Sequence, residues 1–305
     1  MKLHLGVDLA FVRKRWAYGW EWAPIVRNQL GLKYVEFCSD LIDPVILSRG
    51  VRRRLAHEAK EASRKAGLTI YNMYTGLIPH CLFLLSHPDA EARKDGQRWC
   101  ENLLKLSSLL GARGTGGHYD TIPYQMWKSE EKEKKATQNL IRSMVRLSEV
   151  AKRLGQEFLA LEQMYTPNEK PHTLKESEEM LDEINERSSV PVYLTVDVGH
   201  VCSQNYRHSK ADRDPLKWLE KFGARSPIIH LQQTPPEASH HWPFTKKYNA
   251  IGRIRPDEVV DALERSGSKE NYLMLEIFFS LYVNEKTILR EMEESVAYWR
   301  PYVTD

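Results

Sequence analysis

Short apolar runs alternate with longer amphipathic runs along almost the whole chain. The short runs are rich in Val, Ile, Leu and aromatic residues, as buried strands are, whereas the long runs repeat their apolar positions at helical spacing. The pattern predicts strands at residues 3–9, 34–37, 68–74, 112–115, 157–164, 192–198, 228–232 and 272–278. It predicts helices at residues 21–30, 51–67, 89–110, 130–154, 173–187, 214–222, 255–265 and 285–299. Each predicted strand is thus followed by a helix.

Residues with strong local preferences mark several of these helix ends. Gly67 is the last residue of one predicted helix, and Gly111 and Gly155 follow two others, positions where a left-handed residue commonly ends a helix. Thr173 opens another helix and Glu176 stands three residues later, which is the sequence of a capping box. The fourth strand, at 112–115, is followed by more glycine, which favours a site over a packed core there.

Eight strand–helix units in 305 residues predict an α/β fold, a single closed (β/α)8 TIM barrel. Parallel strands joined by helical crossovers bury both faces of the sheet, which explains apolar strands such as residues 227–229 and 272–275. An open dinucleotide-binding sheet is disfavoured because no G-x-G-x-x-G motif follows the first strand. No repeat or low-complexity linker divides the chain, so one domain over residues 1–305 is expected.

Composition and charge narrow the class of protein. The chain is 42% hydrophobic and 28% charged, and its 44 basic residues nearly balance 41 acidic ones, which argues against a nucleic-acid partner. No apolar run approaches the roughly 18 residues of a membrane span, and the first residues read as a strand and not as a signal peptide. Four cysteines without paired spacing fit free thiols: Cys38, Cys81, Cys100 and Cys202. We therefore expect a cytoplasmic protein that binds neither membrane nor nucleic acid.

Four predicted strands end alike, because an apolar run is followed by one ionisable residue. These residues are Glu162, Asp197, His230 and Glu276. In this barrel the active site lies at the C-terminal strand ends, where three buried carboxylates would repel one another without a cation. With the imidazole they suit a divalent ion that accepts oxygen and nitrogen ligands, such as Mn²⁺, Mg²⁺, Co²⁺ or Zn²⁺. Any one of them alone could be an ordinary buried polar group, but four equivalent positions favour the metal site.

The same strand ends resemble a known family. The runs L-x-L-E ending at Glu162, V-D-V-G-H ending at His200, I-I-H-L-Q around His230 and L-M-L-E ending at Glu276 are similar, in the same order, to the xylose isomerase-like barrel superfamily. Within it they are most similar to the sugar (phosphate) isomerase/epimerase branch. The opening residues 5–11, followed by Lys-Arg-Trp, further resemble bacterial erythrulose-phosphate epimerases.

The resemblance implies an isomerase or epimerase of a small ketose or ketose phosphate. It implies a divalent metal ion, Mn²⁺ first, that polarises the carbonyl and stabilises an ene-diolate. Glu162 and Glu276 would be catalytic as well as metal ligands, one removing the proton beside the carbonyl and the other returning a proton from the opposite face. Asp197 would be a ligand only, and His200 would hydrogen-bond a substrate oxygen.

Residues of the loops would complete a substrate site. The expected contacts are His200, His118, Gln232, Lys14, Trp16 and Lys246. His118 follows a glycine-rich strand end where backbone can approach a ligand, although a structural turn explains it equally well. A phosphate would meet cations of the first loop or of the long seventh loop, residues 234–254, each of which could equally remain a solvated surface cation. These candidates are Arg13, Lys14, Arg15, Lys246, Lys247 and Arg253. Trp16 would line the pocket or simply pack.

Other functions fit parts of the same pattern. A dehydratase or lyase could use the same metal site, because ene-diolate chemistry ends in elimination when a leaving group lies β to the carbonyl. An endonuclease IV-like nuclease shares the Asp-x-x-His of Asp197 and His200, but it needs further histidines where the third strand offers Tyr74 and Thr75. A metal-stabilised binding module would leave the two glutamates unexplained. We therefore expect a sugar-converting enzyme that assembles as a homo-oligomer, either a dimer or a tetramer.

Overall fold

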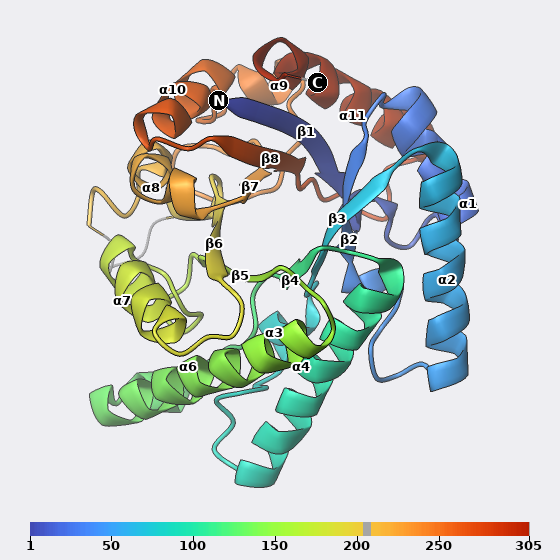
Figure 1. Cartoon of the computed structure of the whole chain (residues 1–305). Coiled ribbons are helices and arrows are strands. Elements are labelled where there is room, and N and C mark those ends of the chain that lie inside the picture. The colour runs from blue at the N-terminus through green and yellow to red at the C-terminus, as the bar shows by residue number, and fades with distance from the viewer. Residues whose placement is uncertain (204–208, 305) are drawn as a thin grey trace.

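The eight apolar runs form a closed parallel barrel in the computed structural model, which describes residues 1–203 and 209–304. The strands follow one another around the barrel in chain order, and the last one pairs with the first (Figure 1). They are β1 (Lys2–Asp8), β2 (Tyr34–Cys38), β3 (Thr69–Tyr74), β4 (Gly114–Gly116), β5 (Phe158–Glu162), β6 (Val192–Asp197), β7 (Ile228–Leu231) and β8 (Glu270–Leu275). The predicted (β/α)8 barrel is confirmed.

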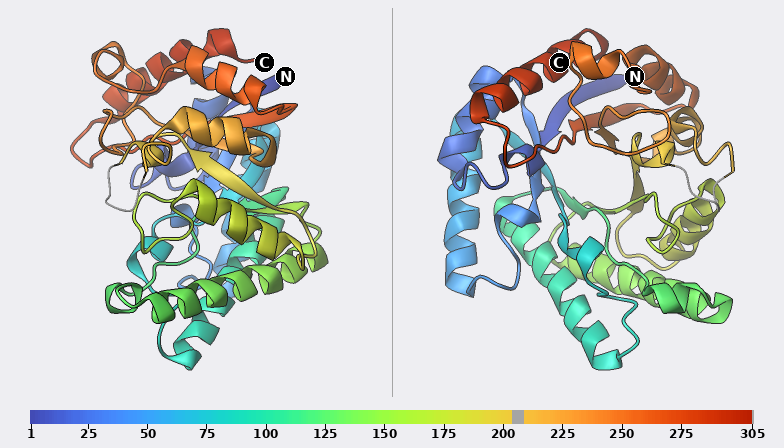
Figure 2. Two further views of the ribbon diagram at one scale, coloured as in Figure 1. Left: turned by 90° about the vertical axis from the view of Figure 1, so that its left-hand side faces the viewer. Right: turned by 180° about the vertical axis from the view of Figure 1, so that it is seen from behind.

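Helices surround this barrel as an outer layer (Figure 2). The longer ones are α2 (Arg49–Ala66), α4 (Ala90–Leu110), α6 (Glu130–Arg153), α7 (Leu174–Asn185), α8 (Pro215–Phe222), α10 (Pro256–Arg265) and α11 (Glu285–Trp299). The short ones are α1 (Gly19–Pro24), α3 (Ile78–Cys81), α5 (Tyr124–Trp127) and α9 (Lys246–Asn249). The helix expected at residues 21–30 is divided, since α1 passes into a π-helical turn over Ile25–Gln29.

Local chemistry explains where several helices begin and end. Gly67 and Gly111 take left-handed conformations, with φ of 72° and 79°, directly after α2 and α4. The Thr173 side chain accepts a hydrogen bond from the backbone N–H of Glu176 at the start of α7, as a capping box requires. The Glu176 carboxylate reaches past Thr173 and accepts from the backbone N–H of His172 at 2.9 Å. Of the two hydrogen bonds expected in the capping box, the one to the Thr173 hydroxyl is therefore formed, whereas the Glu176 carboxylate binds the residue before Thr173.

The inside of the barrel is a packed core. Tyr71 on β3 stacks on Tyr272 on β8 with ring centroids 3.7 Å apart, and Phe158 on β5 packs against Tyr71. Because β3 and β8 are not neighbours in the sheet, this contact crosses the barrel interior. Between the sheet and the helices lies a larger apolar core that includes Trp218 and Trp299. The barrel is thus filled, as is usual for this fold, and not an open channel.

The two ends of the chain lie side by side (Figure 2), and the backbone N–H of Thr304 donates to the carbonyl of Leu3 at 2.8 Å.

Among residues 1–203 and 209–304, no helix combines the length and the apolar character that crossing a membrane demands. The polar residues of interest lie at the C-terminal ends of the strands, and the loops that follow those strands build the remaining walls of the site.

Candidate metal centre and active site

Four strand ends converge on one point. Glu162 closes β5, Asp197 closes β6, His230 lies in β7 and Glu276 follows β8 directly. Each of the four offers one ligand atom, and these atoms all lie within 4.8 Å of one another. His230 Nδ1 lies 2.9 Å from Oε1 of Glu162 and 3.2 Å from Oε2 of Glu276. The strand ends singled out in the sequence are therefore brought together.

The electrostatics of this cluster suit a cation. Burial raises the pKa of Glu276 well above its usual value, and the charges of Glu162 and Asp197 raise it further. Burial also disfavours a charged His230, but the neighbouring carboxylates outweigh it and raise the pKa of the imidazole. Both shifts reflect the repulsion among carboxylates that lie this close together. A divalent cation would compensate this repulsion, and Oε2 of Glu276 is buried without a hydrogen-bond partner in the described part of the chain.

Asp197 is held in place from several directions. Its Oδ1 accepts from the backbone N–H groups of Gly199 at 2.7 Å and His200 at 2.8 Å. The amide of Gln232 lies 3.0 Å from both carboxylate oxygens. A Cβ at Gly199 would come within 2.2 Å of Cδ of Gln232, so the glycine in V-D-V-G-H leaves room for that amide. The nearby imidazoles, His200 first, outweigh burial and lower the pKa of Asp197 below its usual value.

Glu36, in the middle of β2, is a site residue that the sequence did not single out. Its Oε2 lies 2.7 Å from His230 Nε2, and the side-chain amide of Asn72 donates to its Oε1. The pairing of β2 with β3 shifts register between Val35 and Glu36, an irregularity that re-aims side chains. The sequence signal is a carboxylate inside an apolar strand, which by itself does not distinguish a site residue from a buried ion pair.

Tyr74 contacts the same cluster from the end of β3. Its hydroxyl donates to Oε2 of Glu162, and its ring lies 5.1 Å from the ring of His230. Burial and the charge of Glu162 raise the pKa of Tyr74, so it acts here as a neutral donor. Both oxygens of Glu162 therefore have hydrogen-bond partners, whereas Oε2 of Glu276 has none among the described residues and lies 3.2 Å and 3.5 Å from Nδ1 of His230 and His241.

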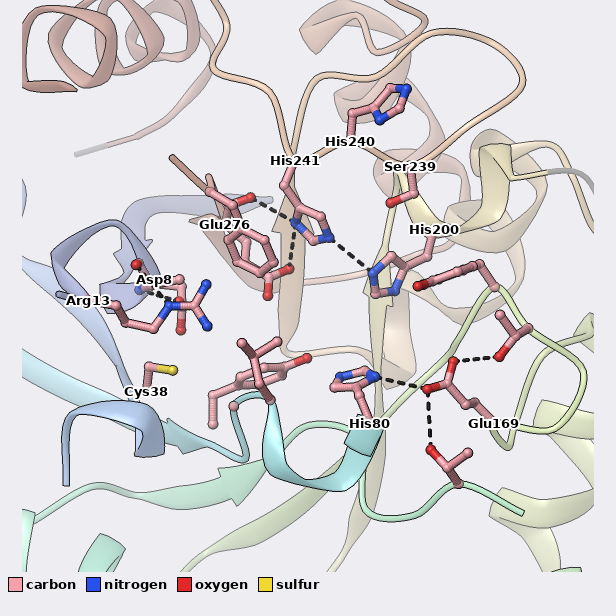
Figure 3. Close-up of a pocket in the computed structure, with 18 of the residues that line it drawn as sticks. Asp8, Arg13, Cys38, His80, Glu169, His200, Ser239, His240, His241 and Glu276 are labelled. Carbon is pink, nitrogen blue, oxygen red and sulfur yellow. Dashed lines mark hydrogen bonds and ion pairs between the residues drawn. The ribbon is translucent and has the colours of Figure 1, made fainter. Parts of the chain in front are cut away.

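A cavity of about 600 Å³ opens above these strand ends (Figure 3). Glu276 and Tyr74 form part of its wall. The ionisable residues that line it are Asp8, Arg13, Cys38, Tyr74, His80, Tyr165, Glu169, His200, His240, His241 and Glu276. The wall mixes cationic and anionic groups, and Phe278 offers a ring beneath the guanidinium of Arg13, 4.6 Å from its centroid. Such a wall suits a small, polar, oxygen-rich ligand.

The expected substrate contacts are placed unevenly. His200 lines the cavity, with Nε2 3.8 Å from Oδ2 of Asp197. Gln232 does not line the cavity and supports Asp197 instead. His118 is fully buried, beside His80, with ring centroids 4.6 Å apart.

The remaining three expected contacts lie away from the cavity wall. Lys14 is exposed, in a left-handed conformation with φ of 66°, whereas its neighbour Arg13 lines the cavity. Trp16 packs on Phe11 with centroids 6.1 Å apart, and Lys246 begins α9, outside the cavity wall.

His241, from the long loop after β7, is a second residue that the sequence did not single out. Its ring stacks on Phe278 at 4.0 Å, its Nδ1 lies 3.2 Å from the carbonyl of Glu276, and its Nε2 lies 3.1 Å from the amide of Gln232. Burial lowers the pKa of His241 to about 4, so it is neutral at physiological pH. The long loop after β7 thus contributes one fixed imidazole to the site.

Known proteins resemble this chain over nearly its whole length. Residues 27–302 match the xylose isomerase-like TIM barrel family. A relative from Brucella abortus (strain 2308), D-erythrulose 1-phosphate 3-epimerase, is 25% identical over 282 residues, which is 91% of this chain and 89% of the relative.

Solved structures share the fold. A protein from Rhodospirillum rubrum, provisionally designated a xylose isomerase, has a TM-score of 0.90 at 24% identity and covers 99% of this chain and 100% of its own. D-Psicose 3-epimerase from Clostridium cellulolyticum has a TM-score of 0.70 at 17% identity, with the same coverage of 99% and 100%. Because the family match spans most of the sequence, the chain belongs to the xylose isomerase-like TIM barrel family.

Proposed function

We propose that the protein is a metal-dependent epimerase of a small ketose or ketose phosphate that moves a proton through an ene-diolate. The observation that carries the proposal is the meeting of two buried glutamates, Glu162 and Glu276, at one candidate cation site, with Glu276 also facing the cavity. The relatives support the enzyme class, sugar isomerases and epimerases. The tetrulose phosphate named for the Brucella relative is the leading candidate substrate.

The residues that would hold the metal are Glu162, Asp197, His230 and Glu276. Three carboxylates and one imidazole form a hard donor set with one nitrogen, for which Mn²⁺ is our first choice among Mn²⁺, Mg²⁺, Co²⁺ and Zn²⁺. When bound, such an ion supplies a Lewis acid that polarises the carbonyl of a ketose.

The two glutamates differ in a way that suits two roles. Glu276 lines the cavity, and its Oε2 has no hydrogen-bond partner among the described residues, with His230 Nδ1 3.2 Å away as its near neighbour. Glu162 is hydrogen-bonded by Tyr74 on one oxygen and contacts His230 on the other. We propose that one carboxylate takes the proton from the carbon beside the carbonyl and that the other, as a carboxylic acid, returns a proton to the opposite face. His200 would donate to a substrate oxygen.

A phosphate on the substrate would meet Arg13. Of the three neighbouring cations of the first loop, Arg13, Lys14 and Arg15, only Arg13 lines the cavity. Its guanidinium donates to Asp40 and packs on Phe278, which fixes the planar group at the wall. Guanidinium groups bind phosphate through paired N–H donors, so a fixed Arg13 suits this role better than the exposed Lys14.

The proposal is tested by a screen of C4 to C6 ketoses and their phosphates with added Mn²⁺, followed by stereochemical identification of the product. We expect epimerisation that stops with a chelator and returns with metal. In D2O the product should carry deuterium at the inverted carbon. Loss of water or carbon–carbon cleavage would assign the protein to the dehydratases or lyases, and turnover unaffected by the chelator would contradict the metal site.

A further inference from the structure

A second group of metal-ligating side chains lies beside the cavity, outside the four residues described above. His80 comes from α3 after β3, His118 follows β4, and Glu169 lies in the loop after β5. Their ligand atoms also lie within 4.8 Å of one another. His80 and Glu169 line the cavity on the side away from Asp8 and Arg13 (Figure 3). Three successive loops thus deliver two imidazoles and one carboxylate to one place.

Two distances within this group lie on either side of the value expected around a small cation. A tetrahedral ion with bonds of about 2.0–2.1 Å places its donor atoms about 3.3–3.4 Å apart. In the protein, His80 Nδ1 lies 2.9 Å from Oε1 of Glu169, and His118 Nε2 lies 3.6 Å from the same oxygen. Shifts of a few tenths of an ångström would bring both pairs to the distance that coordination needs.

The surroundings hold these side chains in position. Thr166 donates to Oε2 of Glu169 at 2.5 Å, which leaves Oε1 directed at the histidines. Thr121 donates to the carbonyl of Pro79 at 2.8 Å, and its oxygen lies 3.3 Å from His118 Nε2. The other nitrogen of His118, Nδ1, is buried with no hydrogen-bond partner in the described ranges. The group is therefore built by surrounding residues but incompletely satisfied as a hydrogen-bonded cluster.

We propose that His80, His118 and Glu169 bind a second divalent cation, of the Zn²⁺ or Co²⁺ type, at the edge of the cavity. Two imidazoles and one carboxylate are a donor set that zinc accepts while keeping a further position open. The His80 side chain is 23% exposed, whereas the other two are nearly buried, so the open position faces the cavity. Binding would replace the contact between His80 Nδ1 and Glu169 by two bonds to the ion, and the neutral imidazole would carry its proton on Nε2.

This site shares no ligand with the Glu162–Asp197–His230–Glu276 cluster, so it stands or falls independently of the proposed function. The competing explanation is a hydrogen-bonded cluster in which His80 donates to Glu169 and no ion binds. The two explanations differ in how many ions the protein holds.

The experiment is a Co²⁺ titration of metal-stripped full-length protein, read by visible absorption and by elemental analysis after dialysis. We expect two ions per chain for the natural sequence and one for His80→Ala, whose affinity for the second ion should fall by at least about 10²-fold, more than the loss of an outer partner costs. His240→Ala is the matched control, because His240 lines the same cavity but lies outside the group.

His80 is partly exposed on a short helix, so its replacement should preserve the fold, which circular dichroism would check. The same number of ions per chain in His80→Ala as in the natural sequence would overturn the proposal. An anomalous difference map from crystals grown with Zn²⁺ gives a second reading. A peak between His80 and Glu169 is expected, and a peak at the four-residue cluster alone would count against the site.

Discussion

His230 Nε2 lies 2.7 Å from Oε2 of Glu36, which joins the imidazole of the metal cluster to a carboxylate three strands away around the barrel. An ionised carboxylate only accepts hydrogen bonds, so Nε2 carries the proton. Nδ1, which faces Glu162 and Glu276, is then the nitrogen left for a cation. Ligating histidines are commonly oriented by such an outer carboxylate. Glu36 thus positions His230 without facing the cavity.

Replacing Glu36 by Gln should weaken metal binding while leaving the ligands themselves intact. The amide can still accept from His230 but lacks the charge that makes the imidazole a better donor to the ion. We expect the dissociation constant for Mn²⁺ to rise by about 10–100-fold, measured by competition with a chelating dye. Glu264→Gln, on the exposed end of α10, is the control and should bind as the natural protein does. Equal affinities in the two variants would remove Glu36 from its positioning role.

Replacing Glu276 by Gln should separate catalysis from metal binding. The amide oxygen can still serve as a ligand, but it cannot accept or return a proton. We expect kcat, measured as formation of the product that the natural enzyme makes, to fall by at least ~10²-fold. Bound Mn²⁺ should stay near its normal level. Glu270→Gln, at the exposed start of the same strand, should leave kcat unchanged. A near-normal kcat in Glu276→Gln would rule out proton transfer by this residue.

Gly199→Ala should disturb the site through crowding. The new methyl group would come within 2.2 Å of Cδ of Gln232, whose amide contacts both oxygens of Asp197. We expect a loss of stability of about 1–3 kcal/mol, as for other overpacked buried sites, together with weaker metal binding. Urea unfolding measures the first effect and dye competition the second. Gly50→Ala, in α2 with open space around it, should be neutral or slightly stabilising. A Gly199→Ala protein as stable as Gly50→Ala would contradict the crowding argument.

The four-residue cluster was predictable because strand ends of a parallel barrel meet by topology. Once the alternation indicated a (β/α)8 barrel, an ionisable residue after an apolar run had to lie near the other three. The predicted end of the last strand was too late, since β8 stops at Leu275 and not at residue 278. Glu276 nevertheless lies at the expected mouth, because the residue after a strand end still points into the same region.

Other site residues were hidden because periodicity does not encode them. Glu36 depends on a shift of register beside Val35, which the alternation of side chains cannot reveal. His241 and Glu169 come from loops and His80 from the short helix α3, and the paths of such connections are set by turns and packing and not by a repeating pattern. The first loop shows the limit most clearly. Its three neighbouring cations look alike in the sequence, but Arg13 lines the cavity whereas Lys14 is exposed, in a left-handed conformation that the pattern does not predict.

Asp120, in the loop after β4, should make stability fall as the pH rises. Burial raises the pKa of Asp120 to about 7. A hydrogen bond from the backbone N–H of Leu85 lowers this pKa but only partly offsets burial. Between about pH 4 and 7 the folded state therefore holds a proton that the unfolded chain has lost. Over that range the free energy of unfolding falls as the pH rises, by up to about 4 kcal/mol in total. Asp120→Asn removes the titration, so urea unfolding from pH 4 to 8 should show the natural protein losing stability relative to this variant. Asp261→Asn, an exposed control on α10, should follow the natural protein, and parallel pH profiles for Asp120→Asn and the natural chain would contradict the shifted pKa.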